Sequence, residues 1–359
     1  MAKVSFYGGA QEVTGSSFLF DDGKTKILID CGMFQCPRFC DLRSQAAFPF
    51  NPSEIDALLV THAHIDHTGR VPKLVREGFR GKIFSTPPTK ELAALMLEDS
   101  LGVLEKEAKR HGEDLIYEEK DIDSALQLWE QIEYHNEFKI GDIKIKFLNS
   151  GHILGSAMVE LEVGGKRVVV SGDLGNPPTP LLKNPEEVMN ANVLLVEATY
   201  GDRLHEDRVA RKLKLERAIE DTLRAGGVLM LPAFSLERTQ ELLFEINDLM
   251  EAGRVSRVPI FLDSPLAIKA TAVYKKYESY FNREAHEKIK SWDDLFKLPN
   301  VKFTLTTEAS KSINEIPAPK IIMAGSGMST GGRILHHERR YLPDPKSALL
   351  MVGYQAPGS

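Results

Sequence analysis

The sequence feature that most constrains this chain is a cluster of histidines and one aspartate at the end of an apolar strand. Residues 57–61 predict a buried strand, and four potential metal ligands follow within six residues: His62, His64, Asp66 and His67. Imidazole nitrogens and carboxylate oxygens are ligands that Zn²⁺ prefers. A strand that enters a tight loop directs the first two histidines to one metal and the last two ligands to another. A solvated polar loop is the alternative interpretation, and three histidines at one strand end make it the weaker one.

Two later fragments supply ligands of the same chemical type. His152 lies between glycines in Ser-Gly-His-Ile-Leu-Gly-Ser, and Asp173 follows an apolar strand at 167–171. A histidine or aspartate in a glycine-rich turn is often only a turn residue. Their position at strand ends, after the histidine cluster, nevertheless favours ligands. Asp30 ends another apolar strand, where we expect its carboxylate to orient a ligating histidine; the alternative is a turn aspartate.

Length and composition indicate a globular protein of two domains. The chain has 359 residues, 42% hydrophobic and 27% charged, and no apolar run approaches the ~20 residues that span a bilayer. The N-terminus shows no signal-peptide pattern, and the cysteines Cys31, Cys36 and Cys40 are poorly spaced for disulfides or a zinc site. We therefore expect a cytoplasmic protein. The net charge of −6 gives no general attraction to nucleic acid, so a polyanion site must be a local patch.

The pattern of apolar residues changes near residue 200. The first part is rich in strands, and the second alternates helices with short apolar strands, which predicts a parallel α/β sheet covered by helices. In the first part we expect strands at 4–7, 17–20, 26–30, 57–61, 143–148, 157–163, 167–171 and a buried one at 193–197, with helices at 70–77, 89–110 and 121–131. In the second part we expect helices at 207–224, 236–251, 266–277 and 308–312, and strands at 228–231, 259–262, 302–305, 320–323 and 348–352. Gly164 and Gly165 predict a hairpin between the strands on either side.

The order of the ligands resembles the metallo-β-lactamase superfamily: an aspartate after a strand, the His-x-His-x-Asp-His motif, a later histidine and a strand-end aspartate. This part of the resemblance covers residues 1 to about 200. It implies that His62, His64 and His152 bind one zinc ion. It also implies that Asp66 and His67 bind a second zinc ion and that Asp173 bridges the two.

Further fragments are similar to the β-CASP branch of that superfamily, whose members process RNA 3′ ends or DNA ends. They are residues 8–16, 30–35, 68–72, 197–203, 232–241 and 325–333. The resemblance implies an α/β fold: a metallo-β-lactamase αββα sandwich over residues 1–203, and an inserted parallel-sheet β-CASP domain over residues 204–359.

In the β-CASP branch the chain then returns to the first domain and adds two histidines. Neither of those motifs occurs before residue 359, and we expect His336 and His337 to be surface residues of a helix. We therefore expect an incomplete sandwich and a partly filled metal site, and an inactive chain remains an open alternative.

The resemblance implies a zinc-dependent ribonuclease that hydrolyses phosphodiester bonds by a two-metal mechanism, in a cleft between the domains. Its partner would be single-stranded RNA, and homo-oligomerisation is left open. The expected catalytic residues are Asp66, Asp173 and Glu197, and the expected substrate contacts are Ser235, Arg238, Ser326 and Arg333. A basic stretch at residues 203–217 is a further candidate RNA surface, with an ordinary solvated helix face as the alternative. A DNA nuclease, a small thioester or lactam hydrolase, and a non-catalytic member of a processing complex are the alternative functions.

Overall fold

A computed structural model describes residues 2–35, 42–204, 207–292, 296, 300–353 and 355. The chain divides into two structural units, each described below by itself. Unit 1 comprises residues 1–177 and 184–202, and unit 2 comprises residues 178–183 and 203–359. Of the cysteines, Cys31 is buried with a free thiol, whereas Cys36 and Cys40 lie outside the described residues.

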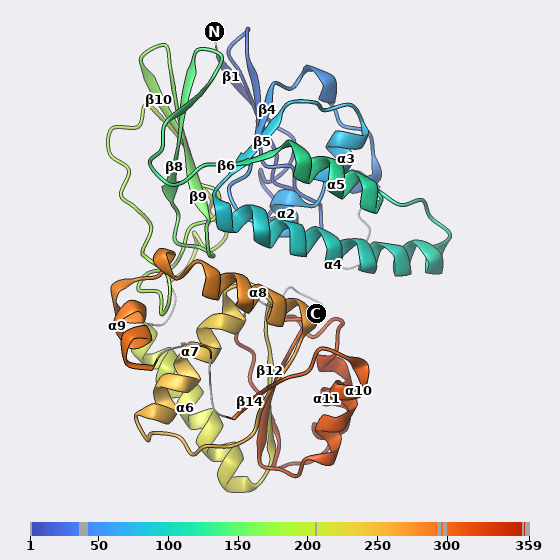
Figure 1. Ribbon diagram of the computed structural model, residues 1–359, viewed down its shortest axis with the longest axis vertical. Helices are drawn as coiled ribbons and strands as arrows, with labels where there is room; N and C mark the ends of the chain where they lie inside the picture. The colour runs from blue at the N-terminus through green and yellow to red at the C-terminus, as the bar shows by residue number, and fades with distance from the viewer. Residues whose placement is uncertain are drawn as a thin grey trace. The chain divides into compact units, whose positions relative to one another are not determined.

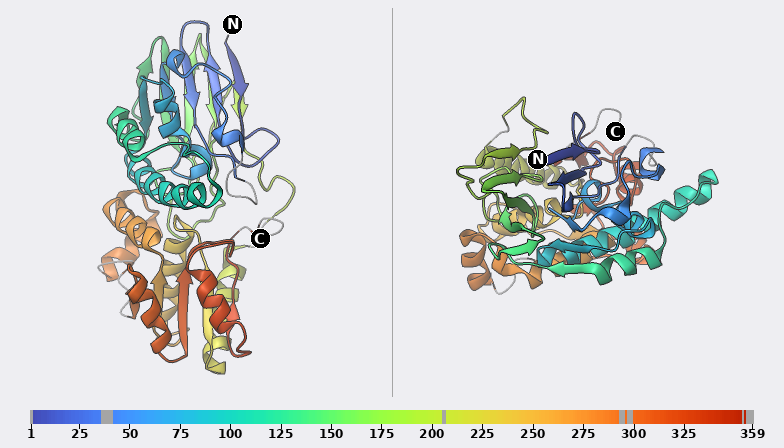
Figure 2. Two further views of the ribbon diagram at one scale, coloured as in Figure 1. Left: turned by 90° about the vertical axis from the view of Figure 1, so that its right-hand side faces the viewer. Right: turned by 90° about the horizontal axis from the view of Figure 1, so that it is seen from above.

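Unit 1 contains two sheets that pack face to face (Figures 1 and 2). The first sheet has the order β1-β2-β3-β4-β5-β6, antiparallel up to β3 and parallel beyond it. Its strands are β1 (Lys3–Phe6), β2 (Phe18–Asp21), β3 (Lys26–Ile29), β4 (Ala57–Leu59), β5 (Lys82–Ser85) and β6 (Trp129–Gln131). The second sheet has the order β11-β10-β9-β8-β7. Its strands are β7 (Phe138–Ile140), β8 (Ile143–Asn149), β9 (Ala157–Val163), β10 (Lys166–Val170) and β11 (Val193–Leu195).

Alternation of side chains along the strands creates the core between these sheets. Apolar residues of the first sheet, among them Ile27, Ile29 and Leu59, contact the inward side chains of β8, β9 and β10. The tight β9–β10 connection has positive φ at both Gly164 and Gly165, as the predicted hairpin requires. Strand ends that carry polar side chains therefore meet at one edge of a well-packed sandwich.

Helices cover the first sheet of unit 1 on the side away from the second sheet (Figure 1). They are α1 (Leu42–Gln45), η1 (Pro52–Glu54), α2 (Ile65–Thr68), α3 (Val71–Arg76), α4 (Pro87–His111) and α5 (Glu119–Leu128). Helix α4 begins at Pro87 and Pro88, whose fixed φ suits a first helical turn, and it ends before Gly112 in the left-handed conformation.

Unit 2 is a five-stranded parallel sheet with helices on both faces (Figure 1). The strand order is β14-β13-β15-β12-β16, formed by β12 (Val228–Pro232), β13 (Ile260–Asp263), β14 (Val301–Phe303), β15 (Lys320–Ala324) and β16 (Ala348–Leu349). The helices are α6 (Arg208–Ala225), α7 (Arg238–Glu251), α8 (Pro265–Lys276), η2 (Glu278–Tyr280), α9 (Arg283–Trp292), α10 (Thr307–Ser312), η3 (Ile313–Glu315) and α11 (Ile334–Tyr341). Side-chain caps start several of them: Asp207, Ser264 and Thr306 each accept a hydrogen bond from a backbone N–H of the first turn. The α/β class predicted for the chain is confirmed.

Apart from shifts of their ends, two predicted elements differ from the structure in type or in burial. The helix expected at 121–131 ends at Leu128, and the next three residues form β6, because they pair with β5 at the sheet edge. The strand expected to be buried at 193–197 is β11, an edge strand in which Val193 and Leu194 are 45% and 56% exposed. Its apolar sequence is typical of an interior strand, but among the described strands only β10 pairs with it.

No helix among the described residues is both long enough and apolar enough to span a bilayer.

Candidate metal centre

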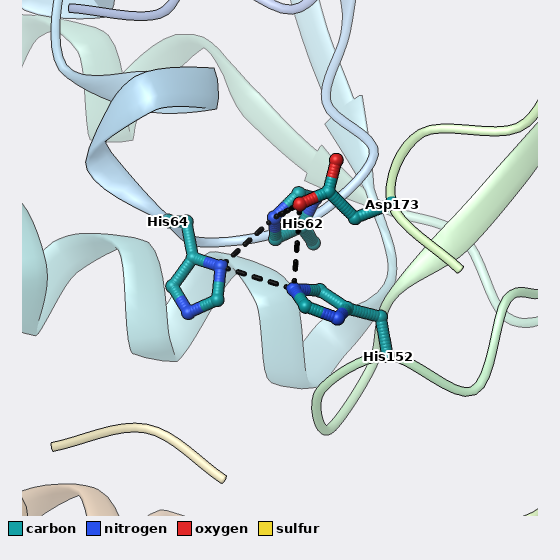
Figure 3. A group of neighbouring side chains, drawn as sticks. All are labelled: His62, His64, His152 and Asp173. Carbon is teal, nitrogen blue, oxygen red and sulfur yellow. Dashed lines mark hydrogen bonds and ion pairs between the residues drawn. The ribbon is translucent and has the colours of Figure 1, made fainter. Parts of the chain in front are cut away.

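Four of the predicted ligands converge at the strand ends of unit 1. Within the described parts of the chain, one group of at least three potential ligands has its ligand atoms within 4.8 Å of one another: His62, His64, His152 and Asp173. Figure 3 shows the four side chains directed toward a common point. His62 and His64 come from the segment after β4, His152 from the β8–β9 connection, and Asp173 from the loop after β10. Both sheets therefore contribute to one cluster.

The three imidazoles are arranged around the Nδ1 atom of His64. This atom lies 3.1 Å from Nε2 of His62 and 3.2 Å from Nε2 of His152. Burial lowers the pKa of His62 well below its ordinary value and lowers the pKa of His64 to about 3. Both rings are therefore neutral at pH 7, and neutral imidazole is the form that binds a metal.

Asp173 contacts histidines on both sides of its carboxylate. Its Oδ2 lies 3.7 Å from Nε2 of His62 and 3.5 Å from Nε2 of His152, whereas its Oδ1 lies 3.2 Å from Nε2 of His67. Asp66 is adjacent, with Oδ2 at 3.9 Å from Nε2 of His67. The structure thus brings all six predicted ligands into one neighbourhood, with the two oxygens of Asp173 directed to different histidines.

The buried carboxylate of Asp30 contacts the ring nitrogen of His67 that faces away from Asp173. Nδ1 of His67 lies 2.7 Å from Oδ2 of Asp30, which is fully buried, so its Nε2 atom points toward Asp173. Burial alone would lower the pKa of His67, but the carboxylates of Asp173 and Asp30 raise it well above its ordinary value. Burial would likewise raise the pKa of Asp173, but the His67 charge holds it well below its usual range. For Asp66, burial raises the pKa to about 6.

Close backbone approaches fix the loops that carry the ligands. A Cβ atom on Gly175 would lie 1.9 Å from the carbonyl oxygen of Gly151, the residue before His152. A Cβ atom on Gly172, the residue before Asp173, would lie 2.8 Å from Cβ of Thr61. Glycine at both positions lets the Asp173 loop pack directly on its neighbours.

Comparison with protein families identifies this arrangement. The family model described as the metallo-beta-lactamase superfamily matches residues 10–219, which is more than half of the chain. The chain belongs to the metallo-β-lactamase superfamily. A second family model, the Beta-Casp domain, matches residues 239–359, which confirms the branch predicted from the sequence.

Curated relatives and a solved structure extend this result. The chain is 39% identical to Ribonuclease TTHA0252 of Thermus thermophilus over 99% of its own length and 80% of the relative. It is 32% identical to Transcription termination factor FttA of Methanocaldococcus jannaschii, covering 99% of the chain and 56% of the relative. The chain thus spans about four-fifths of the first relative and little more than half of the second. A crystal structure of a protein of unknown function from Enterococcus faecalis matches 92% of this chain and 78% of its own, at 12% identity and a TM-score of 0.51, which shows the fold alone.

In this metallo-β-lactamase unit, Glu197 lies beside the loop of Asp173. Its carboxylate accepts hydrogen bonds from the backbone N–H groups of Leu174, at 3.1 Å, and Thr199, at 3.0 Å. Its own N–H donates to the hydroxyl of Ser171. The described contacts therefore tie the segment after β11 to the ligand loop.

Three of the predicted substrate contacts lie at the carboxyl ends of strands in the β-CASP sheet or at the helix start that follows. Ser235 follows β12, and its hydroxyl is 3.4 Å from that of Ser264, which follows β13. Ser326 follows β15, and its hydroxyl accepts from the N–H of Thr330. Arg238 begins α7 and donates to Glu241 at 2.8 Å, with 37% of its side chain exposed. Ligands commonly bind at this edge of parallel sheets.

The guanidinium of Arg333 is held within unit 2. Its Nη1 donates to Oδ1 of Asp263 and to the carbonyl of Thr304, each at 2.7 Å, and its Nη2 donates to the carbonyl of Leu305. The contact of Arg333 with phosphate stays a prediction. The surface position expected for His337 is wrong, because it is 3% exposed and its Nε2 lies 2.7 Å from Oδ2 of Asp263. His336, by contrast, is exposed.

Two basic residues of the stretch at 203–217 pair with acidic residues of other helices. Arg208 contacts Glu284 of α9, Lys212 contacts Asp248 of α7, and Lys288 of α9 contacts the same aspartate. These pairs join three helices, which favours the structural interpretation of this stretch over an RNA surface.

Proposed function

We propose that this chain is a zinc-dependent ribonuclease that hydrolyses RNA phosphodiester bonds. The observation that carries the proposal is the convergence of His62, His64, His152 and Asp173, with their ligand atoms within 4.8 Å. The Beta-Casp match and the similarity to a ribonuclease of Thermus thermophilus support RNA as the substrate.

The donor set of the centre fits zinc. Three imidazoles, those of His62, His64 and His152, and one carboxylate match the ligand types of Zn²⁺ sites. We propose that they hold one ion and that Asp66 and His67 hold a second. Asp173 would contribute one oxygen to each, because its two oxygens are directed to His67 and to His62 and His152. Two zinc ions, when bound, supply Lewis acidity and a nucleophile from water at neutral pH.

Side chains around the centre orient the proposed ligands for this chemistry. Nδ1 of His67 donates to Asp30, which orients the ring so that its Nε2 faces Asp173. The Glu197 carboxylate holds the N–H of Leu174 and so fixes the loop of Asp173. We propose that water attacks phosphorus and the 3′-oxygen leaves, so that the downstream product carries a 5′-phosphate.

Incubation of the full-length protein with end-labelled single-stranded RNA and DNA of the same sequence tests the proposal. We expect cleavage of RNA to 5′-phosphate products, loss of cleavage with a chelator, and recovery with added zinc. Asp173→Asn serves as the control without a bridging carboxylate. Products with a 2′,3′-cyclic phosphate would identify the RNA 2′-hydroxyl as the nucleophile and would contradict the water mechanism. Preferential cleavage of the DNA would support the DNA-processing alternative.

A further inference from the structure

Thr61 lies where the two sheets of unit 1 meet. It follows β4 of the first sheet, is 1% exposed and immediately precedes His62. Its backbone N–H donates to Oδ1 of Asp30 at 2.8 Å. Its carbonyl accepts from the N–H of Ala157, the first residue of β9 in the second sheet, also at 2.8 Å. The backbone of Thr61 is therefore fixed from both sheets.

The hydroxyl of Thr61 lies between two of the proposed ligand histidines and one carboxylate. Its Oγ1 is 2.9 Å from Oδ2 of Asp30, 3.1 Å from Nδ1 of His62 and 3.4 Å from Nδ1 of His67. A threonine hydroxyl has one proton to donate and lone pairs to accept. The carboxylate of Asp30 already accepts the backbone N–H of Thr61, and we assign it the Thr61 hydroxyl proton as well. The hydroxyl oxygen is then available to accept the Nδ1–H of His62.

This direction of the hydrogen bonds places a proton on Nδ1 of both rings. His62 donates to Thr61, Thr61 donates to Asp30, and His67 donates to Asp30 directly at 2.7 Å. The Nε2 atom of each ring then faces Asp173. One buried carboxylate thus orients one histidine from each proposed metal position, one directly and one through Thr61.

The Thr61 side chain also contacts the loop of the proposed bridging ligand, Asp173. A Cβ atom on Gly172 would lie 2.8 Å from Cβ and 3.1 Å from Cγ2 of Thr61. The loop that presents Asp173 therefore rests on this side chain.

We propose that Thr61 is a positioning residue of the metal centre, whose hydroxyl orients His62 for the metal position that His62 shares with His64 and His152. The proposal rests on the metal centre of the proposed function. It assigns unequal roles to the two positions, because His62 depends on the Thr61 hydroxyl whereas His67 has its own contact with Asp30.

Zinc affinity of the full-length protein, measured by competition with a chromophoric chelator, tests the proposal. Thr61→Val removes the hydroxyl at nearly constant volume, and we expect one of two zinc ions to bind about 10–100-fold more weakly, as is typical when such orienting contacts are lost. Thr61→Ser keeps the hydroxyl and should bind both ions like the unmodified chain. Asp30→Asn should weaken both ions. Unchanged binding by Thr61→Val would overturn the proposal, as would equal weakening in Thr61→Ser, which would assign the effect to packing.

Three further measurements separate this role from folding and from the proposed function. Thr222→Val removes another buried threonine hydroxyl, in α6, and should leave zinc affinity unchanged. The tautomer of His62 in the zinc-free protein, read from its imidazole ¹⁵N shifts, should be the Nδ1–H form, and the Nε2–H form would contradict the proposal even if the valine variant did not fold. Cleavage of RNA by the same samples is a separate readout: zinc-loaded protein that leaves RNA intact would contradict the proposed ribonuclease and not the role of Thr61.

Discussion

His64 occupies the central position among the proposed ligands, because its Nδ1 atom faces both His62 and His152. We expect His64→Ala to lose at least one of about two zinc ions and to abolish RNA cleavage. Elemental analysis and the RNA assay measure the two effects. His111→Ala, an exposed histidine on α4 that contacts Glu107, is the matched control and should change neither. Full zinc content in His64→Ala would refute the proposed ligand set.

The contact between Gly175 and Gly151 gives a prediction that depends on shape alone. Gly175→Ala would place Cβ 1.9 Å from a carbonyl oxygen, so the His152 and Asp173 loops must separate. We expect a loss of about 1–3 kcal/mol in the free energy of unfolding, typical of overpacking, together with weaker zinc binding. Gly102→Ala, within α4 and with no neighbour within 4 Å of its Cβ, should instead stabilise the helix by about 0.5–1 kcal/mol. Similar stability for the two variants, measured by urea denaturation, would argue against tight loop packing.

At the scale of elements, Asp263 joins the end of β13 to α10, α11 and the segment after β14. Burial alone would raise the pKa of Asp263, but hydrogen bonds from His337, Ser310, Thr304 and Arg333 hold it at about 2. Because the folded pKa lies below the ordinary value of 3.8, this stabilisation is present above about pH 4 and is lost as the pH falls toward 2. We expect it to contribute on the order of 2 kcal/mol at neutral pH.

Hydrogen exchange at the amides of β13 and β15 measures this contribution locally. In the unmodified protein, protection should fall between about pH 4 and pH 2. Asp263→Asn should show lower protection at pH 7 and a smaller change over the acid range. The same acid dependence in both proteins would mean that another carboxyl group is responsible.

The sequence predicted the positions of helices and strands better than it predicted strand pairing and the burial of single residues. Period-two and helical patterns located most strands and helices, since these depend on local residue order. The same apolar pattern could not show that β11 lies at a sheet edge, because edge position depends on which strands pair. Nor could it show that His337 is buried, because its partner Asp263 is 74 residues away. The metal ligands were predictable because four of them lie together in the sequence, whereas the link from Thr61 to Asp30 and His62 required coordinates.

At the scale of the whole molecule, zinc should act as a link between the two sheets of unit 1. His62 and His64 follow a strand of the first sheet, and His152 and Asp173 follow strands of the second. Zinc at 100 times its dissociation constant should stabilise unit 1 by about 2.7 kcal/mol. Affinity should rise with pH, because binding must displace the proton of His67, whose pKa is raised by Asp173 and Asp30. Hydrogen exchange with zinc and with a chelator should differ in the strands of unit 1, and a change confined to β12–β16 would contradict this link.

All six proposed ligands, together with Asp30 and Thr61, precede residue 174 and belong to unit 1. A ribosome that adds about 5–20 residues per second needs roughly eight to thirty seconds more to synthesise residues 203–359. These six proposed ligands are thus present on the growing chain before the β-CASP sheet exists, and we expect zinc to enter during translation. Stalled nascent chains with residues 1–202 outside the ribosome should retain radioactive zinc, and the His64→Ala chain should retain less. A cell short of zinc at that moment would then release a protein in which unit 2 folds while the metal centre of unit 1 holds no zinc.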